Sequence, residues 1–156
     1  MATRATRALD AAGVAYRRHP YDYEAEATVG KGLQAAAALG LSPGRVLKTL
    51  MAWVDARPVC VVIPSDRQLQ PKALAAACAG KAARMMEVAE AERRSGYKVG
   101  GVSPFGQQRP LPVWFEQDAL AQARVWINGG QRGLLLEVDP ADAVRVLQAS
   151  SAAISR

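Results

Sequence analysis

The stretch from residue 46 to residue 64 reads VLKTLMAWVDARPVCVVIP and predicts the centre of the fold. Its first nine residues form a strand candidate, and residues 55–58 then provide a turn into the apolar run 59–64. This second run is β-branched and nearly all apolar, which is typical of a strand buried on both faces of a sheet. We therefore expect residues 59–64 to form a central strand.

Outward from this stretch, helices and strands follow one another without a regular order. The expected strands are residues 14–19, 83–87, 113–116, 123–128 and 134–138. The expected helices are residues 3–12, 29–39, 70–78 and 88–95, and a last helix that opens at Pro140 with Asp139 as its N-cap. Strand pairs mixed with helices, without regular βαβ alternation, predict an α+β domain around a mixed sheet.

Composition places the chain among folded globular proteins. Its 156 residues are half hydrophobic (50%) and 22% charged, and this length suggests one domain over residues 1–156. The N-terminus has no apolar core of signal-peptide length, and no run approaches the ~20 apolar residues of a membrane span. Cys60 and Cys78 form no C-x-x-C pair, so we expect free thiols in a reducing cytoplasm and no metal site.

Basic residues are in moderate excess over acidic ones. Lys and Arg number 20 against 14 Asp and Glu, which gives a net charge of +6 and a pI near 9.7. A positive excess favours polyanionic partners through counterion release. The basic residues are scattered rather than gathered in one run, so any binding face has to be assembled by the fold.

A loop rich in glycine and proline is the most informative local motif. Residues 96–106 read GYKVGGVSPFG, and the adjacent Gly100 and Gly101 let backbone amides approach a ligand because no Cβ stands in the way. Pro104 fixes its own φ angle and restricts Ser103 to extended geometry. Two interpretations remain open. The segment is a turn between two strands, or a stiff loop that binds a phosphate, a carboxylate or a carbonyl oxygen.

Lys48 stands inside an otherwise apolar strand. It lies on an exposed face or edge, or it projects into a cleft where burial lowers its pKa and its charge neutralises an anion. Thr49 faces the other side of the sheet unless the strand bulges there. His19 is the single histidine, and neither a catalytic triad nor a phosphate-binding glycine motif is recognisable. A site in this chain would therefore work through positioning and backbone electrostatics, without a cofactor.

Four segments taken together resemble the YbaK/EbsC family. They are His19-Pro20-Tyr21, the VLKTL run of residues 46–50, the loop of residues 96–106, and the NGGQRG run of residues 128–133. The family comprises trans-editing aminoacyl-tRNA deacylases related to the insertion domain of bacterial prolyl-tRNA synthetases. The segments occur in the family's order over nearly the whole chain, and the strand and the loop are specific as a pair. The nearest type is YbaK, which removes cysteine from the proline tRNA.

The resemblance implies a fold, a site and a reaction. The fold is a single α+β domain with a central mixed, barrel-like sheet flanked by helices. The reaction is attack of the cysteinyl sulfur on its own ester carbonyl, and the partners are the acceptor end of a mischarged tRNA and possible association with prolyl-tRNA synthetase. The implied catalytic residues are Lys48, Gly100 and Gly101. The implied substrate-binding residues are Tyr21, Thr49, Val102, Ser103, Pro104, Asn128 and Gly130.

Two positions depart from the YbaK pattern. Asn128 stands where serine is usual, and Leu135 stands where an aspartate often occurs. Asparagine still donates and accepts hydrogen bonds, but leucine does neither. We therefore expect cysteine as the first candidate for the amino acid that is removed, and alanine or another small residue as the second. The other hypotheses are a module that binds tRNA or a nucleotide without catalysis, and a structural domain attached to a synthetase.

Overall fold

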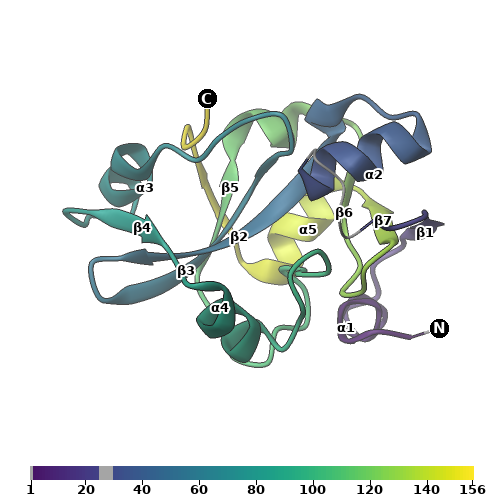
Figure 1. Ribbon diagram of the computed structural model, residues 1–156, viewed down its shortest axis with the longest axis horizontal. Helices are drawn as coiled ribbons and strands as arrows, with labels where there is room; N and C mark the ends of the chain where they lie inside the picture. The colour runs from purple at the N-terminus through teal and green to yellow at the C-terminus, as the bar shows by residue number, and fades with distance from the viewer. Residues whose placement is uncertain (1, 25–29) are drawn as a thin grey trace.

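An eight-stranded mixed sheet forms the centre of the computed structural model, which describes residues 2–24 and 30–156 (Figure 1). The strands are β1 (Arg17–Pro20), β2 (Val46–Val54), β3 (Arg57–Pro64), β4 (Ala83–Met85), β5 (Val113–Glu116), β6 (Val125–Asn128), β7 (Leu134–Val138) and β8 (Ser150–Ala152). The helices are α1 (Arg4–Ala11), α2 (Lys31–Leu39), α3 (Pro71–Ala77), α4 (Val88–Ser95) and α5 (Pro140–Leu147), with 3₁₀ turns η1 (Pro43–Arg45) and η2 (Gln117–Ala121).

The strand order confirms the predicted mixed sheet and its centre. The order is β1-β7-β6-β2-β3-β5-β8, and β4 pairs separately with β2. The β2–β3 hairpin is antiparallel, whereas β2 with β6, β3 with β5 and β5 with β8 run parallel. Strand β3 lies between β2 and β5 and is buried from Val59 to Pro64, as its apolar, β-branched sequence predicts.

One edge of β2 is only partly paired. On one side β3 pairs with β2 from Leu47 to Val54 without a break. On the other side β6 pairs only with Val46 and Leu47, and β4 pairs only from Ala52 onward. Residues 48–51 therefore have no strand beside them on that edge within the described part of the chain. This gap in the sheet positions the site described below.

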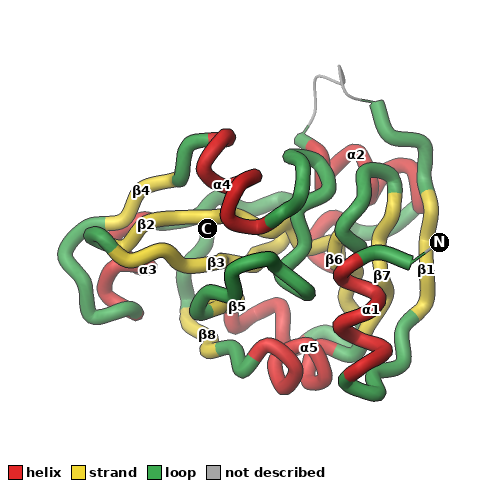
Figure 2. The backbone as a smooth tube through the Cα atoms, turned by 90° about the horizontal axis from the view of Figure 1, so that it is seen from below, coloured by secondary structure: helices red, strands yellow, loops and turns green. Residues whose placement is uncertain are grey.

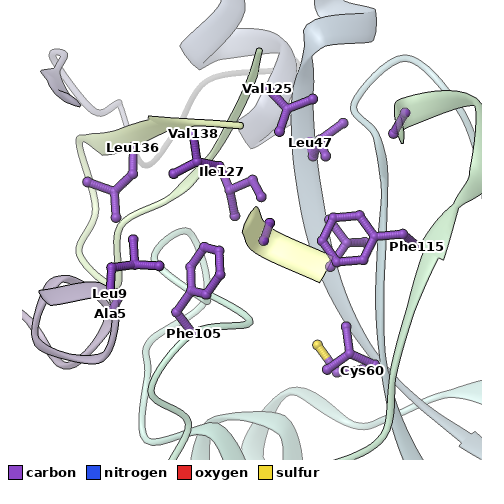
Figure 3. Close-up of a cluster of buried hydrophobic side chains, with 14 of the residues drawn as sticks. Ala5, Leu9, Leu47, Cys60, Phe105, Phe115, Val125, Ile127, Leu136 and Val138 are labelled. Atoms are coloured by element: carbon purple, nitrogen blue, oxygen red, sulfur yellow. The ribbon is translucent and has the colours of Figure 1, made fainter. Parts of the chain in front are cut away.

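Apolar clusters hold helices against both faces of the sheet. Helices α1, α4 and α5 contribute to one cluster with Phe105 and Phe115, part of which Figure 3 shows. On the other face, α3 packs in a second cluster with β3, and α2 packs in a third with Val46, Trp126 and Leu135. Helices α2 and α4 accordingly lie on opposite sides of β2 (Figure 1), and the tube view shows α1 beside β6 and β7 (Figure 2). Within the described residues, none of these helices is long and apolar enough to cross a bilayer.

Several predicted bounds coincide with the structure, and the differences have local causes. The bounds of β2, α4, β5 and β7 are those expected, and Asp139 caps α5 by accepting from the Ala141 amide. The interpretation of residues 96–106 as a turn between strands is wrong, because this loop joins α4 to β5. Strand β8 was not expected, since its short polar sequence becomes a strand only by pairing with β5. Part of the predicted loop over residues 20–28 falls outside the described residues.

Candidate functional site

A cavity of about 320 Å³ opens at the gap in the sheet. Residues 46–51 of β2 line it, together with Tyr21 and the start of α2 on one side. On the other side it is lined by α4, by the end of β4 and by Gly100 and Val102 of the loop of residues 96–106. The cavity therefore lies where β6 and β4 leave β2 uncovered, and it extends past this open edge onto both faces of the sheet.

Lys48 and Thr49 reach the cavity from opposite faces. The unbroken β2–β3 register shows no bulge, so successive side chains alternate, as the sequence predicted for Thr49. Leu47 and Met51 belong to the cluster on the α4 side, whereas Leu50 packs with the cluster on the opposite face. Thr49 accordingly points toward α4 and Lys48 toward α2, and both line one cavity only because the strand edge between them is open.

Lys48 provides a cation at the cavity wall. Its side chain is partly buried, and burial lowers the pKa of the ammonium from 10.5, while the charge of Asp66 opposes this shift. Among the described residues, no carboxylate oxygen lies within 4.0 Å of the Lys48 Nζ. The charge is thus available to an anionic or strongly polar ligand, which corresponds to the cleft interpretation of this lysine.

The Gly100 backbone approaches the cavity in a conformation that favours glycine. Its φ is +92°, and a Cβ at this position would lie 2.4 Å from the Tyr23 hydroxyl oxygen. Asn128 holds the loop against the end of β6, because its Nδ2 donates to the Gly100 carbonyl (3.0 Å) and its Oδ1 accepts from the Gly130 amide (2.7 Å). Asn128 therefore ties the two glycine-containing segments together at the cavity.

Four of the predicted site residues do not line the cavity. The Gly101 amide donates to the Lys98 carbonyl (2.8 Å) within a turn, so it is not a free donor. Ser103 and Pro104 are buried residues of the loop, and the Ser103 hydroxyl accepts from the Phe105 amide (3.2 Å). A Cβ on Gly130 would lie 2.7 Å from the Tyr97 ring. These four residues therefore lie outside the cavity lining, and their role in catalysis or substrate binding stays a prediction.

The other six predicted residues meet at the cavity. They are Tyr21, Lys48, Thr49, Gly100, Val102 and Asn128. Burial raises the pKa of the Tyr21 phenol, which therefore stays protonated and able to donate at neutral pH. His19 lies outside the lining, and its Nε2 interacts with Glu137 Oε1 at 2.9 Å.

Sequence reasoning missed the apolar lining of the cavity. Three exposed side chains form its rim: Met85 (49% exposed), Val88 (59%) and Val99 (37%). Deeper in, the lining includes Met86 and Ala91. It also includes Leu135, which the comparison with the YbaK pattern had already singled out. No sequence signal distinguishes such residues from ordinary core positions, because an apolar side chain on a helix or strand predicts burial whether or not a cavity lies beside it.

Comparisons with known proteins agree with this geometry. The family model of the aminoacyl-tRNA editing domain matches residues 28–146. A protein of Enterococcus faecalis (strain ATCC 700802 / V583), named "Putative Cys-tRNA(Pro)/Cys-tRNA(Cys) deacylase EbsC", is 29% identical over 139 residues, which cover 88% of this chain and 84% of that protein. The chain thus belongs to the aminoacyl-tRNA editing domain family and is of the YbaK/EbsC-like trans-editing deacylase type, as the resemblance implied.

Solved structures show the same fold. The crystal structure of the hypothetical protein APE2540 superposes with a TM-score of 0.87 at 26% identity, covering 99% of this chain and all (100%) of that one. A protein described as a "putative trans-editing enzyme for prolyl tRNA synthetase" superposes with a TM-score of 0.85 at 23% identity, covering 98% of this chain and 95% of that one. The single α+β domain with a mixed sheet is therefore the fold predicted.

Proposed function

We propose that this protein removes a wrongly attached amino acid from the proline tRNA, with cysteine as the first candidate. One observation carries the proposal: the cavity of about 320 Å³ joins the Lys48 cation to the Gly100 loop. Among the described residues, no cysteine, serine, histidine or carboxylate lines this cavity, so the hydroxyls of its Thr49 and Tyr21 have no histidine or carboxylate base in the lining. This lining supports a reaction in which the substrate supplies its own nucleophile. The similarity to a relative named as a deacylase of Cys-tRNA(Pro) and Cys-tRNA(Cys) supports the same substrate.

The proposed cleavage is an intramolecular acyl transfer. The cysteinyl sulfur, after losing its proton, attacks the carbonyl carbon of its own ester and forms a carbon–sulfur bond. The ester carbon–oxygen bond breaks, and its electron pair leaves with the ribose oxygen, which takes up a proton. The four-membered thiolactone that results is opened by water to give free cysteine. Positioning of sulfur against carbonyl is the enzyme's main contribution, because a well-oriented intramolecular reaction gains most from fixed geometry.

Backbone amides and Lys48 have separate roles in this proposal. Among the described residues, no protein group accepts from the Gly100 or Val102 amide. Either N–H can therefore donate to the carbonyl oxygen as negative charge develops there, an effect of about 3–4 kcal/mol per donor. Lys48 holds the ribose–phosphate end of the tRNA as a fixed cation. The apolar rim of Met85, Val88 and Val99 accommodates the terminal nucleoside.

The experiment is a deacylation assay with tRNA(Pro) charged with cysteine, alanine, serine or 2-aminobutyrate. The 2-aminobutyryl group matches cysteine in size but has a methyl group in place of the thiol. We expect rapid release of cysteine and slow release of 2-aminobutyrate. Release of both at similar rates would exclude thiol assistance. No release of any amino acid would exclude the deacylase proposal and leave a non-catalytic tRNA-binding module.

A second candidate substrate is Ala-tRNA(Pro), and the apolar wall of the cavity favours it. Leu135 and Ala91 line the cavity, and neither side chain can donate to or accept from a polar amino-acid side chain. Each methylene contributes only about 1–3 kcal/mol to such discrimination, so cysteine and alanine are both small enough to compete. The alanine arm of the same assay decides between them.

A further inference from the structure

The open edge of β2 presents main-chain polar groups to the cavity. In an antiparallel pair, successive residues direct their N–H and C=O groups alternately toward the partner strand and away from it. The Ser65 amide donates to the Val46 carbonyl (2.8 Å), so Val46 faces the β3 side. The Met86 amide donates to the Met51 carbonyl (3.0 Å), so Met51 faces the opposite side. Thr49 lies two residues from Met51 in the same unbroken register, and its N–H and C=O therefore face the gap.

Neither neighbouring strand pairs with these Thr49 groups. The ladder to β6 ends at the pair of Leu47 with Ile127, and the ladder to β4 begins at Ala52. No turn or loop hydrogen bond from the described residues reaches the Thr49 N–H or C=O. The Thr49 N–H donor and C=O acceptor thus lie next to each other at the cavity wall, and neither has a hydrogen-bond partner among the described residues.

The Thr49 side chain is a second, independent observation. Its Oγ1 is buried and has no hydrogen-bond partner in the described part of the chain. A buried polar group without a partner destabilises the folded state, so proteins leave few of them. Thr49 lines the cavity, and its unpartnered hydroxyl lies on the α4 side of the same open strand edge.

We propose that the Thr49 main chain binds the backbone of the amino acid carried by the tRNA, as one added residue of a strand. This inference rests on the proposed deacylase function. The α-ammonium of the aminoacyl group donates to the Thr49 C=O, and the Thr49 N–H donates to the ester carbonyl oxygen. An amine and a carbonyl on the same carbon match the two bonds that opposed residues exchange in an antiparallel pair.

The proposal makes the free α-amino group a recognition element separate from the amino-acid side chain. A tRNA whose amino group is acylated, as in a formylated or peptidyl tRNA, cannot donate in this way and also brings extra bulk to the strand edge. The protein would therefore act on aminoacyl groups and spare nascent chains. Hydrogen bonds to a charged group contribute about 1.5–3 kcal/mol, so loss of the amine is expected to weaken binding about tenfold or more.

Binding is measured first, with two stable analogues of the tRNA end. One is adenosine carrying cysteine through a 3′-amide, and the other carries 3-mercaptopropionate, which lacks only the amine. We expect the second to bind about tenfold more weakly or worse. The Thr49 amide signal should shift in the ¹⁵N–¹H spectrum with the first analogue. Equal affinities, or an unmoved Thr49 amide when the first analogue is bound, would overturn the proposal, and so would no binding at all.

Turnover of intact substrates separates this inference from the deacylase proposal. Cys-tRNA(Pro) is compared with its N-acetyl derivative, and the 3-mercaptopropionyl ester of tRNA(Pro) controls for the bulk of the acetyl group. Cleavage of the first with slow cleavage of both others supports the inference. Equal cleavage of all three overturns it and leaves the deacylase function standing. Failure to cleave Cys-tRNA(Pro) overturns the deacylase function, and the binding comparison then judges Thr49 separately.

Discussion

At the scale of single residues, Lys48 shows how burial and topology give an ordinary side chain a special role. A lysine in a strand is commonly exposed to solvent. Lys48 instead lies in a strand whose residues Leu47 and Met51 belong to the core. Because the sheet opens beside it, the ammonium lines a cavity and its pKa is lowered by burial. The cationic form is lost as the pH rises through this lowered pKa, so binding of an anionic ligand by Lys48 is expected to weaken as the pH rises.

Replacement of Lys48 tests its role directly. We expect Lys48→Ala to abolish turnover of the mischarged tRNA, because the fixed cation at the cavity is lost, while the melting temperature changes little. Lys72→Ala is the matched control, since Lys72 is exposed on α3 and does not line the cavity. Single-turnover deacylation rates for both variants provide the measurement. Wild-type rates in Lys48→Ala would show that the lysine assignment is wrong.

Glu116 is a residue whose charge stabilises the fold rather than the site. Its side chain is 1% exposed, and burial raises its pKa, but hydrogen bonds from Asp118, Ser155 and Ile154 outweigh burial and leave the pKa below 4.5. The backbone amides of Asp118 and Ile154 and the Ser155 hydroxyl all donate to this carboxylate. In the variant Glu116→Gln, the side-chain N–H₂ group would stand where these donors need an acceptor. We expect this variant to lose about 3 kcal/mol of unfolding free energy at pH 7.

The pH dependence of this loss has a definite sign. A lowered folded-state pKa stabilises the protein above the unfolded value, and the stabilisation disappears as pH falls through the folded value. The difference in unfolding free energy between wild type and Glu116→Gln should therefore shrink below pH 4.5. Denaturant titrations at pH 7 and at several acidic pH values measure it. A difference that grows toward acid would contradict the assignment.

At the scale of elements, the loop of residues 96–106 owes its rigidity to anchors on both sides. Phe105 is fully buried, and the Tyr97 hydroxyl donates to its carbonyl oxygen. At the other end, Arg132 Nε donates to the Val99 carbonyl (2.9 Å), and Asn128 holds Gly100. The loop is thus tied to the core and to the β6–β7 turn, which keeps its amides beside the cavity.

A methyl group at Gly100 should disturb this loop selectively. In Gly100→Ala the Cβ would meet the Tyr23 hydroxyl at 2.4 Å and the backbone would keep a φ near +92°, a conformation that costs an alanine about 1–2 kcal/mol. We expect a fall in turnover larger than the fall in stability. Gly44→Ala is the control, because its Cβ would have nothing within 4 Å and its φ is ordinary. Equal turnover in the two variants would refute the role of the loop.

At the scale of the whole molecule, the sheet carries helices on both faces (Figure 2). A cavity extends past its open edge. The three exposed large apolar side chains in the described part of the chain, Met85, Val88 and Val99, all line this cavity. Exposed apolar groups gathered at one site are typical of binding surfaces rather than of a monomer's general surface. The net charge of +6 favours the approach of a nucleic acid to this protein.

The rim can be made polar without touching the core. We expect the double variant Met85→Ser/Val88→Ser to raise the KM for mischarged tRNA severalfold with little change in kcat, because both side chains are exposed and outside the reacting groups. Stability should change by no more than about 0.5 kcal/mol per site. Ala89→Ser is the control, since Ala89 is exposed on α4 and does not line the cavity. An unchanged KM would exclude the rim from substrate binding.

Local chemistry made much of the fold and part of the site predictable. Apolar periodicity defined β2 and β7, and Asp139 before Pro140 defined the start of α5. Lys48 and Gly100 stood out because their residue types are unusual for a strand and a stiff loop. The supporting residues were harder to separate from ligand contacts, since Gly101 and Gly130 look like Gly100 in sequence. Their hydrogen bonds and packing in three dimensions distinguish them.

The sequence by itself determined the apolar strands, the position of the lysine and the conformational freedom of the loop, because each depends on neighbouring residues along the chain. Only the tertiary structure decided that the pairing of β6 with β2 stops at Ile127 opposite Leu47 and that the pairing of β4 with β2 starts only at Ala52, leaving residues 48–51 uncovered. Such a gap depends on where three separate strands meet, and no local pattern within β2 encodes it. The relative positions of these three strands produce the cavity, its apolar rim and the unpaired N–H and C=O groups of Thr49.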